Sequence, residues 1–193
     1  MKRKIISLII GTLILFIWNA LSWMVLPFHS NTLNSIPDNA INTELLKEHL
    51  TKDGVYHYPG FPKDDTPQAL KEMENRIETG PRITLMVFKR GKTELFSMLS
   101  FLGSFVINFV TVLLLYSLIQ VSRVQTTKTI LLMSLFVALI IGFASDLTQM
   151  NWYLFPLGYT ILNMVDHLIP FLLIGILLSK YSFKVKIVCK KQK

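Results

Sequence analysis

Long apolar runs divide this chain more clearly than any other feature. Four runs reach the roughly 20 residues that a helix needs to cross a hydrocarbon layer about 30 Å thick. Of the 193 residues, 51% are hydrophobic, and the charged residues are crowded into the segments between the runs. The pattern therefore predicts a mainly α membrane protein with four transmembrane helices, at residues 5–27, 97–121, 129–149 and 155–179.

The polar segment between the first and second runs has shorter patterns of its own. It predicts a helix at 42–52 capped by Asn42 or Thr43, a strand at 55–58, a helix between a Thr66 cap and Gly80, and a strand at 82–88. A unit of this size buries only a marginal core. We therefore expect it to pack on the ends of the membrane helices or on a partner.

These patterns predict four parts of the chain. Residues 1–27 form the N-terminus and first span, 28–96 an extracytoplasmic α/β insertion, 97–179 a three-helix transmembrane hairpin bundle, and 180–193 a basic tail. The short connectors make each of the last three helices an antiparallel neighbour of the next. The first run, which is about 22 residues long and has no small-residue cleavage site, is expected to be an uncleaved anchor.

The basic residues predict the orientation. Six of the twenty lie within 180–193, directly after the last run, and the segments assigned to the inside carry no acidic residue. The positive-inside rule then places both termini in the cytoplasm, as in a multi-pass protein of the inner (plasma) membrane. A basic cluster at 89–92 opposes this, but it borders a long loop, where the rule is weaker. The net charge of +8 is expected to meet anionic lipid headgroups rather than nucleic acid.

The last run carries the most unusual residues. Asn163, Asp166 and His167 lie at i, i+3 and i+4, a spacing expected to bring them to one helix face. Pro170 lacks an N–H, so it frees the backbone carbonyl of Asp166 and is expected to kink the helix. Ionisable groups at membrane depth are costly and usually serve a function. A proton relay or cation site and a structural hydrogen-bond knot both remain open.

Other polar side chains are expected at the same level or above it, on all four spans. A cleft open to the outside is one interpretation, and hydrogen bonding between helices is the other. The full set of candidate residues is Asn19, Ser22, Asn108, Asp146, Gln149, Tyr159, Asn163, Asp166 and His167.

The motifs of several enzyme classes are absent from the sequence. It has no phosphate-binding loop, no nucleophile elbow and no zinc-protease motif. Its single cysteine, Cys189, permits no internal disulfide, and the spacing of His29, His49 and His57 fits no local metal-ligand pattern. We therefore expect no cofactor and no metal, and the sequence gives no positive reason to assign an enzyme activity.

The stretch from Trp18 to His29, taken with Asn151-Trp152-Tyr153, resembles uncharacterised bacterial inner-membrane proteins of similar size. The resemblance covers the first span and the last two. It implies no activity, cofactor or catalytic residue.

Three functions are compatible with these patterns. The first is a binding or assembly protein whose outer α/β module recognises a partner protein or a ligand; a homo-oligomer also remains open. The second is a small transporter or proton-coupled carrier that uses Asp166 and His167. The third is a membrane enzyme that acts on lipid or peptidoglycan precursors at the outer face.

Overall fold

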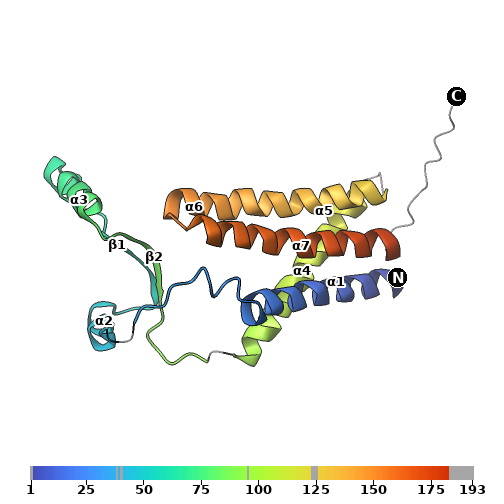
Figure 1. Ribbon diagram of the computed structural model, residues 1–193, viewed down its shortest axis with the longest axis horizontal. Coiled ribbons are helices and arrows are strands. Elements are labelled where there is room, and N and C mark those ends of the chain that lie inside the picture. The colour runs from blue at the N-terminus through green and yellow to red at the C-terminus, as the bar shows by residue number, and fades with distance from the viewer. Residues whose placement is uncertain (1, 38, 40, 95, 123–125, 183–193) are drawn as a thin grey trace. The chain divides into compact units, whose positions relative to one another are not determined.

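The computed structural model describes residues 2–37, 39, 41–94, 96–122 and 126–182. It is mostly helical, with 69% of residues in helices and a small two-stranded sheet (Figure 1). The chain divides into two compact units. The first, the helical unit, is Met1–Asn34 with Phe96–Lys193, and the second, the mixed unit, is Ser35–Leu95. Of the predicted basic tail at 180–193, residues 183–193, which include Cys189, lie outside the described residues.

The helical unit contains the four long apolar helices that the sequence predicts. Each is long and apolar enough to cross a membrane. Two of the four are built from consecutive segments, and each of these two includes a π-helical turn. The first is α1 (Lys2–Ala20) with η1 (Leu21–Val25), the second α4 (Met98–Val121), the third α5 (Thr127–Ile141) with η3 (Gly142–Leu147) and α6 (Thr148–Tyr153), and the fourth α7 (Leu157–Tyr181).

Helix α7 is central to the packing of this unit. It contacts both α1 and α5, while α4 packs mainly against α1, and Figure 1 shows α5 and α7 running side by side. Branched side chains such as Val112, Ile130 and Ile174 are fully buried where these helices meet. Small residues permit the close approach: a Cβ at Gly175 would lie 2.6 Å from Ser134 Oγ.

The mixed unit follows the predicted order of helix, strand, helix and strand. Its elements are α2 (Thr43–His49), β1 (Gly54–Tyr58), α3 (Pro67–Thr79) and β2 (Ile83–Phe88). The predicted caps are confirmed: the Asn42 side chain accepts from two backbone N–H groups of α2, and the Thr66 hydroxyl accepts from Ala69 N–H. The strands are antiparallel, with Val55 opposite Val87.

Burial in the mixed unit differs from the sequence-based expectation. The spacing of Leu45, Leu46, His49 and Leu50 predicts one buried face on the helix at 42–52, yet none of the four is buried. Among the described residues of the unit, only Pro59 is buried. Helices of seven and thirteen residues and two short strands are too few to enclose a core.

The contact between α5 and α7 at Gly175 generates a stability prediction. Gly175→Ala should lower the free energy of unfolding by about 1–3 kcal/mol, because the new methyl group would overlap Ser134 in a packed interface. Thermal unfolding in detergent measures the change. Gly103→Ala is the matched control, since a Cβ there meets nothing within 4 Å. Equal stability of the two variants would contradict the close helix approach.

A second prediction concerns the end of the sheet where β1 begins and β2 ends, beside the pair Gly54 and Phe88. The Lys89 ammonium and the backbone N–H of Arg90 both donate to the Asp53 carboxylate, which holds the pKa of Asp53 below its ordinary value of 3.8. The contact should stabilise this end of the sheet fully at pH values above that ordinary pKa. The stabilisation should fade as the pH falls through the lower pKa of the folded protein.

Carboxyl NMR of the full chain, labelled with ¹³C-aspartate, should show Asp53 titrating below 3.8. Lys89→Gln should return the pKa toward that value, whereas Lys71→Gln on α3 should leave it unchanged. If the pKa of Asp53 is the same in Lys89→Gln as in the wild type, this ion pair is excluded.

Candidate functional site

The Asp166 carboxylate, on α7, collects three hydrogen bonds. Trp18 Nε1–H donates to Oδ1 at 3.1 Å, and Ser22 Oγ lies 2.7 Å from Oδ1 and 2.9 Å from Oδ2. His29 Nε2 lies 2.7 Å from Oδ2. Asp166 itself is only 8% exposed. An ionised carboxylate can accept from all three groups at once, which is what a buried charge requires.

His29 is the most deeply enclosed member of this group, at 1% exposed. Its ring stacks on Trp23, with ring centroids 3.7 Å apart and an angle of 12° between the planes. The Tyr159 ring is nearly perpendicular to the His29 ring, with the two centroids 6.3 Å apart. Its Nδ1 is buried and has no hydrogen-bond partner among the described residues. When Nε2 donates to Asp166, Nδ1 carries only a lone pair, which is the less demanding group to leave unpaired.

A turn after the first helix places His29 against Asp166. Leu33 N–H donates to the His29 carbonyl at 3.1 Å, and the Thr32 hydroxyl donates to the same oxygen at 3.0 Å. A Cβ at Gly158, near the start of α7, would lie 3.9 Å from the Thr32 methyl group. Residues 26–34 therefore belong with the helical unit and fold over the first turns of α7.

His167 makes a separate pair on another side of α7. Its Nε2 lies 3.2 Å from Oδ2 of Asp146, which is buried within η3. Next to it, Gln149 Nε2 donates to Ser145 Oγ at 3.0 Å. The sequence predicts that Asn163, Asp166 and His167 converge in one cluster, but in the structure Asp166 and His167 pair with different parts of the chain. Consecutive residues on a helix point about 100° apart, so Asp166 meets α1 while His167 meets η3.

Asn19 and Asn108 form a third group between α1 and α4. Both line a pocket of about 190 Å³, together with Phe16, Ala20, Trp23, Met24, Phe101 and Ser104. Asn108 is 7% exposed, and its Nδ2 has no partner among the described residues. Asn19 does not reach Asp166, so the nine predicted residues fall into separate groups rather than around one cleft.

The remaining predicted residues have local roles. Tyr159 stacks on Phe155 at 5.4 Å and borders His29. Asn163 is half-buried and has no hydrogen bond within the described residues. Helix α7 continues through Pro170, which is fully buried. Because Pro170 has no N–H, the Asp166 carbonyl lacks its usual helical donor.

Sequence reasoning missed Trp18 and His29 as partners of Asp166. The spacing of Trp18 and Ser22, four residues apart, was available in the sequence and places both on one helix face. A buried carboxylate also needs donors, and the first span and the residues just after it supply Trp18, Ser22 and His29. Those two facts together point to the observed group.

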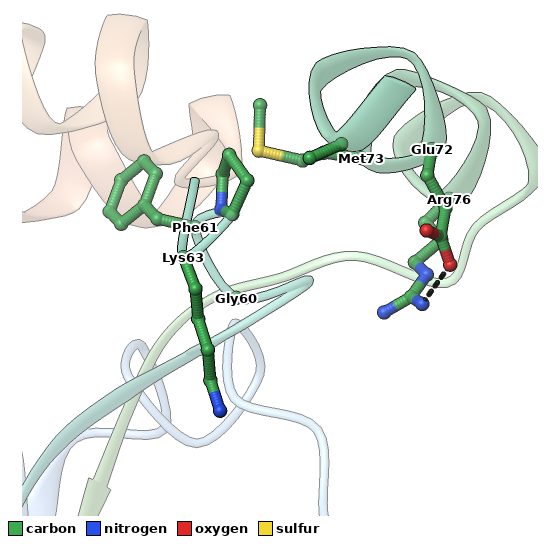
Figure 2. Close-up of a pocket in the computed structure, with 8 residues that line it drawn as sticks. Gly60, Phe61, Lys63, Glu72, Met73 and Arg76 are labelled. Atoms are coloured by element: carbon green, nitrogen blue, oxygen red, sulfur yellow. Dashed lines mark hydrogen bonds and ion pairs between the residues drawn. The ribbon is translucent and has the colours of Figure 1, made fainter. Parts of the chain in front are cut away.

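The mixed unit has a candidate site of its own, shown in Figure 2. A pocket of about 390 Å³ lies between the loop at 60–63 and α3, a volume within the range of small-ligand sites. Phe61, which is 79% exposed, and Met73 form its apolar part, while an ion pair joins Glu72 and Arg76 on α3. Lys63 points away from Met73.

The three donors to Asp166 generate a test of its role. Asp166→Ala should lower the free energy of unfolding by about 2–4 kcal/mol, since it leaves buried N–H and O–H groups without an acceptor. Asp166→Asn keeps one acceptor oxygen and should lose less. Thermal unfolding in detergent gives the comparison, with Asn163→Ala on the same helix as control. The structural role is excluded if Asp166→Ala unfolds at the wild-type temperature.

The chemistry open to these groups is limited by what surrounds them. Within the described part of the chain, no three His, Cys, Asp or Glu side chains gather where they could hold a metal ion. An Asp-oriented histidine can act as a general base through its second nitrogen, but Nδ1 of His29 is enclosed and meets no described donor.

Comparisons with protein-family models, with curated proteins and with solved structures found no match for this chain.

Proposed function

We propose that this chain is a binding or assembly protein of the inner (plasma) membrane. In this proposal both termini lie in the cytoplasm, and the mixed unit is presented outside to a partner protein. The observation that carries the proposal is the uncovered apolar face of the sheet. Val87 is 81% exposed, and its cross-strand neighbour Val55 and its strand neighbours Ile83 and Leu85 are exposed as well.

The position of these residues makes their exposure informative. Residues 83, 85 and 87 alternate with Met86 and Phe88, so they share one face of β2. Apolar side chains gathered on a single strand face are typical of a surface that another protein covers. The unit has no compensating core, because Pro59 is its one buried residue among those described.

The sheet edges suggest how a partner could bind. In the described residues the sheet has only β1 and β2, so an outer edge of each strand has no neighbouring strand. An extended segment can add to such an edge through backbone hydrogen bonds and place its apolar side chains on the exposed face. A partner that contributes a strand would satisfy both features.

Charge favours a protein over the bilayer as the cover. The segment 28–96 carries nine basic and ten acidic residues, which leaves it nearly neutral. Attachment to an anionic bilayer surface relies on an excess of basic residues, and this segment has none. An apolar strand face on a nearly neutral unit suits a protein partner better.

The carrier alternative draws less support from the geometry. A proton path through Asp166 and His167 would need the two side chains to act in sequence, yet each pairs with a different element. Asp166 already accepts from three donors, an arrangement that suits a fixed link better than a transported proton. The enzyme alternative lacks an activated nucleophile among the described groups.

Site-specific photo-crosslinking in living cells tests the proposal. With a benzophenone amino acid at Val87, the full chain should form an adduct with one other protein, identified by mass spectrometry. The same amino acid at Glu74, exposed on α3, should not. The purified partner should bind the full chain directly. Val87→Glu should weaken this binding about tenfold or more, because it places a charge in an apolar interface, and Glu74→Lys should leave it unchanged.

Other adducts would overturn the proposal. An adduct between two copies of this chain would identify the face as a self-association surface. Crosslinking to lipid, or to the chain's own membrane helices, would show that the face is covered without a partner. Wild-type affinity in Val87→Glu would place the partner's binding surface elsewhere.

A further inference from the structure

A groove on the surface of the helical unit combines an apolar lining with a cation. It lies between α5 and α7, has a volume of about 490 Å³ and is lined by Thr127, Lys128, Leu131, Leu132, Leu135 and Leu172. The leucines of α5 follow Lys128 at i+3, i+4 and i+7, so they continue one helix face for about 10 Å. The groove therefore runs from a charged end into apolar surroundings.

Among the described residues, no acidic side chain pairs with the charged end of the groove. Lys128 is exposed and stands in the first turn of α5, where the positive end of the helix dipole also favours an anion. The sequence of the helical unit contains only two acidic residues, Asp146 and Asp166. Asp146 is about 27 Å further along the same run of helix, and each of the two already faces a histidine.

We propose that this groove binds an anionic phospholipid of the surrounding bilayer. The phosphate lies at Lys128 and the hydroxyl of Thr127, and an acyl chain follows Leu131, Leu132 and Leu135. A basic group at the mouth of an apolar groove between helices is the combination that recognises such lipids. The site is separate from the partner surface of the mixed unit, and either can fail without the other.

A second groove in the same unit shows what the charge adds. It has a similar volume of about 430 Å³ and is lined by Thr111, Leu114, Leu115, Leu118, Val137, Ile141 and Phe171, with no charged residue. Any acyl chain can occupy such a surface. Selection for an anionic headgroup requires the cation, which only the groove at Lys128 has of these two.

Native mass spectrometry of the full chain in detergent tests the assignment. The probes are phosphatidylglycerol and phosphatidylcholine with identical acyl chains. The wild type should bind phosphatidylglycerol about fivefold more tightly, the effect of one basic residue near an anionic headgroup. Lys128→Gln should remove this preference. Arg3→Gln, which removes a basic residue in the first turn of α1 outside the groove, should keep it.

Filling each groove separates the site from general lipid contact. Leu132→Trp should weaken phosphatidylglycerol binding, whereas Leu114→Trp, which fills the uncharged groove, should not. Circular dichroism verifies the helical content of each variant. If Leu132→Trp does not fold, the exposed Lys128 substitution decides the result.

Three results would overturn the proposal. One is an unchanged preference for phosphatidylglycerol in Lys128→Gln. Another is an equal loss in Arg3→Gln, which would show diffuse attraction to the basic end. The third is a lipid-free dimer, or a complex with another protein, that Leu132→Trp dissociates, because the groove would then be a protein interface.

Discussion

The helical unit depends on the hydrogen bonding of one carboxylate. A charged group inside an apolar span is tolerated only where donors surround it, and Asp166 finds Trp18, Ser22 and His29. These donors lie at least 137 positions away in the sequence, in the first helix and the turn after it. The need to satisfy Asp166 therefore fixes which face of α1 meets α7, and holds residues 26–34 against the helical unit.

Each side of the fourth long helix, α7, contacts a different neighbouring segment. Asp166 faces α1, His167 faces η3, and Gly175 lets α5 approach closely. Two π-helical turns supply key partners: Ser22 and Trp23 come from η1 and Asp146 from η3. Turns of this kind are rare and frequently lie at functional sites. Here they lie where the polar groups of the first and third helices meet α7.

Local patterns explain which parts could be predicted from the sequence. The four long apolar helices follow from run length, and the caps at Asn42 and Thr66 follow from hydrogen bonding within one turn, so the structure confirms both predictions. Helical spacing tells which residues share a face, but it does not tell which neighbour that face meets. Asn19 and Ser22 are three residues apart and so share a helix face, yet Trp18 is the residue that joins Ser22 at Asp166, and Asn19 lines a pocket between α1 and α4.

The same limit applies to the mixed unit. The alternation at 83–88 predicts a strand, and β2 is present, but alternation alone does not say what covers each face. The structure leaves the Ile83, Leu85 and Val87 face exposed within a nearly neutral segment. In the helical unit, by contrast, both acidic residues face histidines while the basic residues have no acidic counterpart at their end. One unit thus presents uncovered apolar surface without net charge, and the other presents uncompensated positive charge beside apolar grooves. That difference is why we propose a protein for the first surface and an anionic lipid for the second.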